Sequence, residues 1–397
     1  MESPHLYRRN APTDTEASVI DRAIQLMSLQ SRSGATPILT LKHLAVQSGV
    51  RLSFLERIAD RELDAYDVHE VKKRGRSSKR LIAAPHDELL RAQRWLLDNV
   101  FAHASIHSAS YAYQTGRSAK LCAQQHLGAR WAIKLDAKDF FHQYDEFQVF
   151  NLLRGFGYSP LVRLEIARIC TRHVSTDQDW LPDKYRQPTR LRSIPELPPA
   201  EYMWSGPDLI DVEAYAHLPH SQGRRLGYLP QGAPTSGAIS NALAYDLDQS
   251  FEKLAEANRM TYTRYADDIF LSSYSIFERP SAEQIVHQAH SIFEQHELQP
   301  HARKSRILTP GRPIELLGIR VDGESTQLPK RIKSKIEFHI RGVESFGVHV
   351  HASHSGFREG LGFVNYLEGM IRYAINIEPE RGRRWNRRLR HALSGRV

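Results

Sequence analysis

The segment Tyr265-Ala266-Asp267-Asp268 constrains the fold of this chain more than any other part of the sequence. It lies between short apolar stretches, with Tyr262 before it and Ile269-Phe270-Leu271 after it, so it predicts a strand, a tight turn and a second strand. The turn places two adjacent carboxylates at the tip of a hairpin. Either they bind a divalent cation, which offsets their mutual repulsion, or they are solvated turn residues, because Asp is common in turns.

The composition indicates a large folded body with a polyanionic partner. A chain of 397 residues is long enough for two or three domains, or for one large enzyme body, with an ample core. The 54 Lys and Arg residues exceed the 45 Asp and Glu residues and give a net charge of +9, which favours a polyanion as partner or substrate. Much of the basic surplus is concentrated in two clusters, residues 72–80 and 381–390.

Several classes of protein are disfavoured by the same composition. The two cysteines, Cys122 and Cys170, are too few for a disulfide framework or a thiolate metal site. The first residues lack the apolar core of a signal peptide, and no apolar run has the length of a membrane span. The histidines lack the spacing of a zinc site. We therefore expect a cytoplasmic protein without a membrane partner.

Hydrophobic periodicity predicts an α+β fold. Residues 41–59 have the pattern of a helix-turn-helix, which is either a DNA-reading motif or two small helices that cap a larger domain. The basic cluster at residues 72–80 predicts a hairpin with a positive tip. The expected helices are residues 87–101, 148–170, 238–255, 281–296 and most of the last sixty residues, and the expected strands include 131–135 and 316–321.

Three carboxylates form the candidate catalytic and metal site. Asp136 ends the strand at residues 131–135, and the hairpin tip with Asp267 and Asp268 is able to pack beside it. Such a set matches a two-metal nucleotidyl-transfer site, for which Mg²⁺ suits the all-oxygen ligands. Asp136 and Asp267 are the principal predicted ligands. Asp268 is either the third ligand or a solvated, hydrogen-bonding neighbour.

The order of the motifs resembles that of a reverse transcriptase, an RNA-directed DNA polymerase, and more narrowly that of the bacterial retron-type enzymes. The resemblance covers roughly residues 65 to 390. Its motifs are Arg80-Leu81-Ile82-Ala83-Ala84-Pro85 with Gln93 and Trp95, Tyr113-Gln114-Thr115-Gly116-Arg117-Ser118, Leu135-Asp136-Ala137-Lys138-Asp139-Phe140-Phe141, Leu229-Pro230-Gln231-Gly232-Ala233-Pro234-Thr235-Ser236, Tyr265-Ala266-Asp267-Asp268, Lys304 and Gly318.

The resemblance implies a right-hand polymerase fold. A helical N-terminal extension would occupy residues 1–65, and fingers and palm residues 66–320, with an irregular insertion at 172–225. A basic thumb that binds RNA or duplex would occupy residues 321–397.

The resemblance also implies roles for individual nucleotide-binding residues. Phe141 would lie under the incoming sugar and exclude a 2′-hydroxyl, unless it is a core residue. Gln231 would contact the nucleotide or the template, unless its loop is a purely structural turn. Arg80, with Lys73 or Lys72, would hold the triphosphate, and Tyr265 would also bind the nucleotide.

Further roles concern the later part of the chain. Lys304 would protonate the departing pyrophosphate as a catalytic residue, or else line the basic groove. Trp385 would either stack on RNA or pack in the core. The predicted RNA-binding residues are Arg383, Arg384, Arg387 and Arg388.

Two elements depart from the retron pattern. The sequence has Cys122-Ala123-Gln124-Gln125-His126 where retron enzymes usually have Asn-Ala-x-x-His, and Leu316-Leu317-Gly318 where they usually have Val-Thr-Gly. Both elements are associated with recognition of a cognate structured RNA. A defence-associated reverse transcriptase outside the retrons therefore stays an alternative, beside a group II intron-like enzyme, a DNA-binding regulator and an RNA-binding scaffold that restrains a partner effector.

The leading hypothesis from the sequence is a magnesium-dependent reverse transcriptase with two ions per active site. Its expected partners are a structured noncoding RNA as template and primer, the RNA–DNA hybrid product and deoxynucleoside triphosphates. The family further implies a retron-type antiphage defence system, an msDNA product and a separate effector protein.

Overall fold

A computed structural model of the chain describes residues 4–13, 15–72, 79–173 and 226–394. They belong to two compact units, each discontinuous in sequence: the described residues of 1–108 with those of 138–249, and the described residues of 109–137 with those of 250–397. Helices combined with an antiparallel sheet confirm the predicted α+β class. The domain boundaries predicted at residues 65 and 320 divide the chain into consecutive regions, whereas these units are discontinuous. Those boundaries stay a prediction. In the part of the chain that the structure describes, no helix is both long and apolar enough to cross a membrane.

The first unit is mostly helical and is organised around α5 (Asp87–Asn99). The buried face of α5 packs against neighbouring helices, and its buried Gln93 donates hydrogen bonds of 2.8 Å to the Tyr66 hydroxyl and to the carbonyl of Ile169. The other elements of this unit are α1 (Pro4–Asn10), α2 (Ala17–Arg32), α3 (Leu41–Ser48), α4 (Leu52–Ala59), β1 (Tyr66–Lys72), β2 (Lys79–Pro85), η1 (Phe101–His103), η2 (Phe140–Gln143), α7 (Glu146–Leu152), η3 (Leu153–Phe156), α8 (Pro160–Cys170) and α11 (Pro234–Leu243).

The helix-turn-helix-like segment folds as the two short helices α3 and α4. The Thr40 hydroxyl caps α3 by accepting a hydrogen bond from the backbone of His43, and Gly49 ends that helix with a φ of 66°. The two helices bury Leu44 and Leu55 and lie against α5 and α8. This packing favours the interpretation that they cap a larger unit.

The basic hairpin consists of β1 and β2, paired antiparallel from Tyr66 opposite Pro85 to Lys72 opposite Lys79. The loop at Gly232 lies against β2, where the Ala83 amide donates to the Gln231 carbonyl at 2.8 Å. Gly232 has a φ of 125°, and a Cβ there would lie 2.6 Å from the Ala83 oxygen. Glycine is therefore required where this loop meets the strand.

The second unit contains an antiparallel sheet with the strand order β4-β5-β3-β6. Ile133 and Leu135 of the central strand are fully buried. Phe251 stacks on Tyr262 of β4, at 5.6 Å between ring centroids, and meets Phe293 at 5.3 Å. The elements around this sheet are α6 (Ala119–Gln124), β3 (Trp131–Asp136), α12 (Tyr245–Ala257, which begins in the first unit), β4 (Thr261–Tyr265), β5 (Asp268–Ser273), α13 (Arg279–Gln295), η4 (Ala302–Lys304), β6 (Arg306–Leu308), β7 (Glu315–Leu316) and β8 (Ile319–Arg320).

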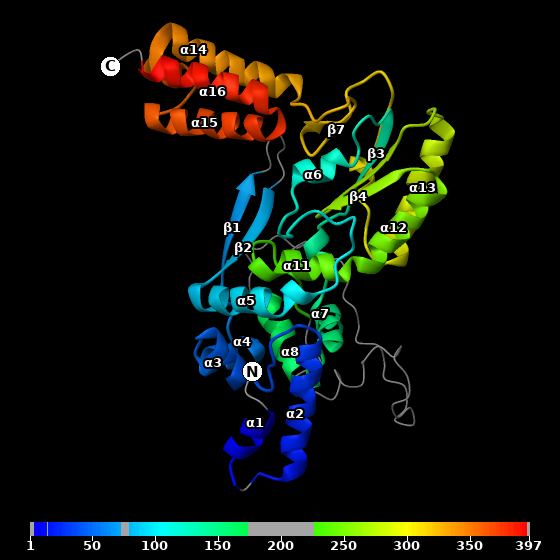
Figure 1. The fold of residues 1–397 in the computed structure, drawn as a ribbon, viewed down its shortest axis with the longest axis vertical. Coiled ribbons are helices and arrows are strands. Elements are labelled where there is room, and N and C mark those ends of the chain that lie inside the picture. Colours follow the sequence, from blue (N-terminus) through cyan, green and yellow to red (C-terminus); the bar gives the residue numbers. More distant parts are fainter. Residues whose placement is uncertain (1–3, 14, 73–78, 174–225, 395–397) are drawn as a thin grey trace. The chain divides into compact units, whose positions relative to one another are not determined.

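Three helices complete the second unit: α14 (Lys330–His354), α15 (Gly360–Ile377) and α16 (Pro379–Ser394) (Figure 1). Their buried apolar side chains include Phe363, and each such side chain contributes about 1.5–3 kcal/mol. A Cβ at Gly382 would lie 2.4 Å from the Ile375 nitrogen, so α15 and α16 approach closely at this glycine. Gly347, with φ 79° and ψ 168°, kinks α14.

Three predicted elements were wrong in detail. The helix expected over 148–170 is divided into α7, η3 and α8, because Gly157 has a φ of 81° and Pro160 starts a new helix. The helix expected over 238–255 is broken at Ala244. The strand expected over 316–321 is the short hairpin β7–β8, which turns at Leu317 and Gly318 with φ values of 52° and 76°. The predicted insertion at 172–225 lies almost entirely outside the described residues.

Candidate active site

The predicted acids come together at one end of the sheet in the second unit. Asp136, the last residue of β3, lies opposite Asp268, the first residue of β5, in the antiparallel register. The Ala137 amide donates to the Asp267 carbonyl at 3.0 Å, and the His301 amide donates to the Asp136 carbonyl at 2.7 Å. Backbone hydrogen bonds therefore hold the ends of β3 and of the β4–β5 hairpin together.

The hairpin turn is strained and supported from behind. Ala266 has a φ of 54°, a left-handed conformation that costs a non-glycine residue about 1–2 kcal/mol. The fully buried Arg264 donates to the Ala266 carbonyl at 3.2 Å. Arg264 is itself held by backbone hydrogen bonds to Ala109 and Tyr111. The tip that carries Asp267 is thus fixed by the strand that precedes it.

Negative charge at this end of the sheet is only partly compensated. Burial, followed by the charges of Asp268 and Asp136, raises the pKa of Asp267, against a smaller opposing effect of Lys304. The Lys304 ammonium donates to both carboxylate oxygens of Asp136, at 2.6 and 2.8 Å. Lys134 pairs with Asp268 at 2.8 Å. Two lysines therefore hold two of the three acids, while Asp267 retains a raised pKa.

The chemistry of this donor set fits a divalent cation. Three carboxylates with excess negative charge are the oxygen ligands that Mg²⁺ prefers, and a bound cation would favour ionised Asp267. Among the described residues, no group of three or more Asp, Glu, His or Cys side chains is placed so that it could hold a metal ion without rearrangement. A cation would have to compete with Lys304 for Asp136. Asp268 is in the same situation, since it pairs with Lys134 at 2.8 Å, and its role as a third metal ligand stays a prediction.

Other predicted residues of the second unit lie around this cluster. Tyr265 ends β4 and packs, half-buried, against the apolar core of the unit. Lys304 is the last residue of η4. The residue just before η4 is His301, whose amide donates to the Asp136 carbonyl. Lys134 was not among the predicted site residues, although its place on the acid-bearing strand, two positions before Asp136, was a usable signal because alternate residues of a strand share one face.

A buried polar cluster lies behind the hairpin. His126 forms hydrogen bonds of 2.7 Å with the hydroxyls of Thr263 on β4 and Ser272 on β5. The thiol of Cys122 lies 3.2 Å from the same Thr263 hydroxyl. Burial lowers the pKa of His126 to about 4, so the ring is neutral near pH 7. Cys122 and His126 thus belong to the packing that aligns β4 with β5.

The predicted nucleotide-binding residues of the first unit are described within that unit alone. Phe141 lies in η2, half-buried, with its ring centroid 5.9 Å from that of Phe140. Gln231 is half-buried in the loop fixed against β2, and Arg80 is exposed on β2. Lys73 lies outside the described residues, as does the tip of the hairpin. The role of Arg80 and Lys73 in holding the triphosphate therefore stays a prediction.

The basic residues of α16 divide into two kinds. Arg383, Arg384 and Arg387 are exposed. Arg388 instead binds Glu344 through two hydrogen bonds and Glu337 through a third. Trp385 is buried and donates to Glu337 at 2.6 Å, which favours the core-packing alternative over stacking on RNA.

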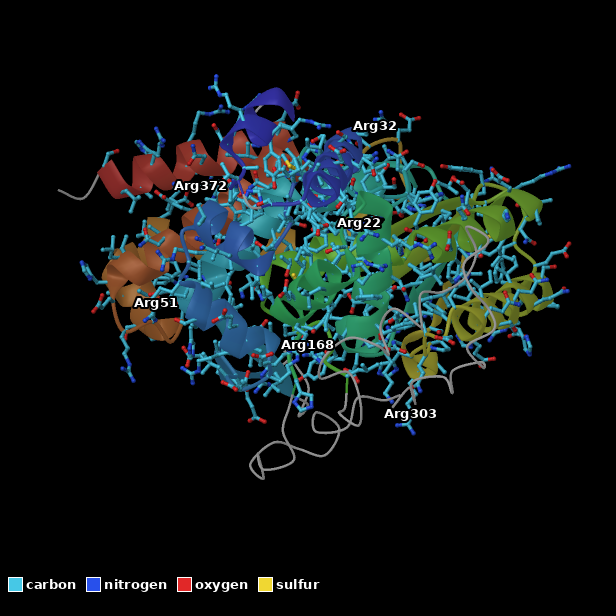
Figure 2. All side chains as sticks on the ribbon, turned by 90° about the horizontal axis from the view of Figure 1, so that it is seen from below. Arg22, Arg32, Arg51, Arg168, Arg303 and Arg372 are labelled. Carbon is cyan, nitrogen blue, oxygen red and sulfur yellow. The ribbon has the colours of Figure 1, made fainter. Side chains whose placement is uncertain are left out.

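Exposure also separates arginines elsewhere in the structure. Arg22, Arg32, Arg303 and Arg372 are exposed, whereas Arg168 is buried (Figure 2). A count of basic residues therefore overstates the charge that is available to a partner.

The geometry of the acids is accompanied by similarity to known proteins. A family model described as reverse transcriptase (RNA-dependent DNA polymerase) matches residues 219–321, which include the acid-bearing hairpin and Lys304. The retron Mx162 reverse transcriptase of Myxococcus xanthus is 28% identical over 363 residues, which cover 88% of this chain and 66% of the relative. Over most of its length the chain is similar to the retron reverse transcriptases.

Two further relatives agree with this relationship. The retron Mx65 reverse transcriptase of Myxococcus xanthus is 27% identical over 78% of this chain and 61% of its own length. The retron Ec86 reverse transcriptase of Escherichia coli is 24% identical over 76% of this chain and 81% of its own length. The match spans slightly less than two thirds of the Mx162 and Mx65 enzymes. The predicted retron-type relationship is confirmed, and it supports the predicted right-hand polymerase fold.

Proposed function

We propose that this chain is an RNA-directed DNA polymerase that copies a structured noncoding RNA into DNA. The observation that carries the proposal is the meeting of Asp136 with Asp267 and Asp268 at one end of a sheet, in a relative of the retron reverse transcriptases. This arrangement is the protein part of a nucleotidyl-transfer site.

In this proposal Asp136 and Asp267 would be the principal ligands of two Mg²⁺ ions, and Asp268, which pairs with Lys134, would be the third. Bound Mg²⁺ would activate the primer hydroxyl and neutralise the triphosphate. Lys304 reaches the Asp136 carboxylate, so its ammonium is placed at the acid cluster. We assign Lys304 the transfer of a proton to the departing pyrophosphate.

The remaining roles rest on the motifs. Phe141 excludes the 2′-hydroxyl of a ribonucleotide, and Tyr265 and Gln231 contact the nucleotide or the template. Arg80 and Lys73 hold the triphosphate as charge-assisted donors. The fixed contact between the Gln231 loop and β2 supports a common role for these two elements.

The partners follow from the same relationship. We infer a structured RNA as template and primer, deoxynucleoside triphosphates, and an RNA–DNA hybrid bound by the exposed arginines of α16. A cytoplasmic antiphage system with an msDNA product and a separate effector protein is the biological setting that the retron relatives suggest. A defence-associated reverse transcriptase outside the retrons stays the second candidate, because Cys122 and Leu316-Leu317-Gly318 depart from the retron pattern.

The decisive experiment measures DNA synthesis by the purified protein on a poly(rA)·oligo(dT) template-primer with labelled deoxynucleotides. We expect synthesis that requires Mg²⁺ and is abolished by a chelator. Asp267→Asn should reduce the rate by about 10³-fold, because a loss of several kcal/mol of transition-state stabilisation has that effect.

The matched control is Asp98→Asn, which removes one carboxylate from an exposed position on α5. It should leave the rate unchanged. Absence of synthesis by the wild-type protein, or equal rates for wild type and Asp267→Asn, would overturn the proposed activity.

A further inference from the structure

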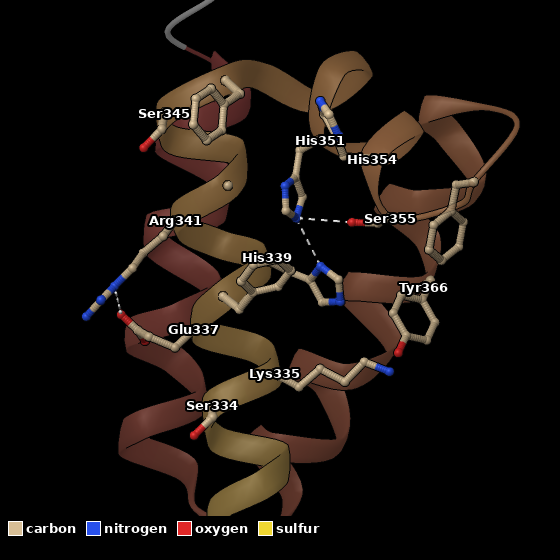
Figure 3. A pocket seen from close by; sticks show the side chains of 14 residues that line it. Ser334, Lys335, Glu337, His339, Arg341, Ser345, His351, His354, Ser355 and Tyr366 are labelled. Carbon is tan, nitrogen blue, oxygen red and sulfur yellow. Dashed lines mark hydrogen bonds and ion pairs between the residues drawn. The ribbon is translucent and has the colours of Figure 1, made fainter. Parts of the chain in front are cut away.

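The helices α14 and α15 form a groove that the proposed polymerase chemistry does not use. Its volume is about 1220 Å³, and it opens beside the kink of α14 (Figure 3). The side chains that matter for its chemistry are the aromatic residues Phe338, Phe346 and Tyr366, the histidines His339 and His351, and Lys335.

Large aromatic side chains on this groove remain exposed. Phe338 and Phe346 of α14 are 62% and 64% exposed, an unusual state for residues of this size. The Phe338 ring lies 5.3 and 5.2 Å from the imidazoles of His339 and His351, measured between centroids. The groove thus offers flat, apolar surfaces against which another planar group is able to stack.

Two buried histidines give the groove a polar floor. His339 Nδ1 lies 3.0 Å from His351 Nε2, and the two rings point toward each other in Figure 3. A Cβ at position 342 would lie 2.1 Å from His351 Nδ1, so the pair fits only because residue 342 is glycine. Burial lowers the pKa of both histidines, which therefore present neutral hydrogen-bonding groups.

The charge around the groove favours an anion. Glu337 and Glu344 are the acidic residues of α14, and both are bound by Arg388 of α16. Glu337 also pairs with Arg341 at 3.4 Å. The Lys335 ammonium lies 5.2 Å from the centroid of the Tyr366 ring, within the groove. Glu337 is the carboxylate that lines the groove, and because it is paired, the groove presents aromatic faces next to the Lys335 ammonium.

We propose that this groove binds an unpaired nucleotide of single-stranded RNA, with the base stacked on the aromatic side chains and the phosphate near Lys335. Aromatic faces combined with positive charge are the usual means of binding single strands without a fixed sequence. The inference rests on the proposed function in one respect, that the protein binds RNA. A groove for an apolar segment of a partner protein is the competing outcome.

The experiment compares two fluorescent probes bound to the full chain: a short single-stranded RNA, and the same strand with abasic sites in place of its central bases. The wild-type protein should bind the complete RNA about tenfold more tightly, because only that probe is able to stack. Phe338→Ala should bind the two probes equally, within about twofold. Lys335→Gln should weaken both probes alike and lower the salt dependence of binding by about one ion.

The matched control is Leu361→Ala, a truncation of a 70% exposed residue of α15 that lies outside the groove lining. It should keep the tenfold preference. Gly342→Ala should remove the preference by displacing His351, and circular dichroism shows whether this variant stays folded. Phe338 is exposed, so its truncation tests the inference even if Gly342→Ala unfolds.

An unchanged preference for the complete RNA in Phe338→Ala would overturn the proposal. So would the finding that this variant binds both probes like the wild type but loses a copurifying protein, which would identify a protein-binding groove. Probe binding is measured without Mg²⁺ or deoxynucleotides, so it does not depend on DNA synthesis. Failure of DNA synthesis on poly(rA)·oligo(dT) therefore bears on the proposed enzyme, and failure of base discrimination bears on the groove.

Discussion

At the scale of single residues, the buried carboxylate of Glu146 connects distant parts of the first unit. It accepts hydrogen bonds from Arg61 at 2.6 Å, from Arg168 at 2.9 Å and from the Gly227 amide at 3.1 Å. Burial alone would raise its pKa, but the charges and hydrogen bonds of Arg61 and Arg168 lower it to about 2. Glu146 is therefore ionised wherever the protein is folded near neutral pH.

Replacement of Glu146 by Gln should destabilise the protein by about 3–5 kcal/mol near pH 7, because it leaves two buried guanidinium groups without their carboxylate. The pKa of Glu146 is about 4.5 when unfolded and about 2 when folded. Its contribution is therefore complete above pH 4.5 and is lost as the pH falls towards 2. Urea denaturation of both proteins over this range should show the stability difference shrinking with acid.

Glu165 of α8 provides a control of opposite sign. Burial, with the charges of Asp60 and Glu56, raises its pKa to about 7. The folded state favours the protonated form of the Glu165 carboxyl, so the folded state becomes less stable as the pH rises through 7. Glu165→Gln should therefore raise the melting temperature at about pH 8 and change it little at about pH 5. For Glu146, a stability difference between wild type and Glu146→Gln that does not change with pH would contradict the proposed role of its ionised carboxylate.

At the scale of elements, His126 joins the segment after α6 to the two strands of the acid-bearing hairpin. The ring is fully buried between the hydroxyls of Thr263 and Ser272. Both strands end at the tip that carries Asp267. His126 is thus a positioning residue for the hairpin, and it acts through β4 and β5 rather than on a substrate.

His126→Phe should destabilise the protein by about 1–3 kcal/mol for each hydroxyl left without a partner. In the wild type, the pKa of His126 is about 6.5 unfolded and about 4 folded, so its contribution is complete above pH 6.5 and decreases as the pH falls towards 4. The variant should lack this part of the pH dependence. Its DNA synthesis should also fall, because the hairpin is less firmly held.

The control for this prediction is His287→Phe, which replaces an exposed histidine on α13. It should keep the loss of stability between about pH 6.5 and 4. Equal pH dependence of unfolding for wild type and His126→Phe would show that His126 does not carry the titration.

Local sequence patterns predicted the elements that carry the site. Alternating or continuous apolar runs identified β3 and the β4–β5 hairpin, and therefore the meeting of Asp136 with the tip that carries Asp267 and Asp268. The division of the helix expected over 148–170 was also signalled by Gly157 and Pro160, but apolar periodicity continued across them. The Leu317 turn was missed because a left-handed leucine has no local signature.

The sequence did not show which residues that are distant in the chain form ion pairs with each other. Lys134 pairs with Asp268, and Arg388 pairs with Glu337 and Glu344, although these residues are far apart in the chain. Composition ranks all arginines of the terminal cluster alike. Only the packing of α14 against α16 shows that Arg388 neutralises carboxylates of the same unit.

At the scale of the whole molecule, the net charge of +9 should make RNA binding strongly dependent on salt. The charge that matters is the part that no carboxylate of the protein neutralises. On α16, Arg383, Arg384 and Arg387 are exposed, whereas Arg388 binds two glutamates. Adjacent arginines of one helix should therefore differ in what they contribute to binding and to stability.

Joint replacement of Arg383, Arg384 and Arg387 by Gln should reduce the slope of log K against log salt for RNA by about 2–3, since each phosphate contact contributes about 0.7–0.9. Arg388→Gln should leave this slope unchanged. It should instead lower the melting temperature, because Glu337 and Glu344 lose their shared partner. Fluorescence anisotropy over a salt series, with thermal unfolding of each variant, measures both effects. The result would be different if Arg388→Gln lowered the slope as much as the loss of one of the other three arginines. The Arg388 guanidinium of the wild type would then exchange its glutamates for a phosphate when RNA binds, and all the arginines of α16 would contribute to one binding surface.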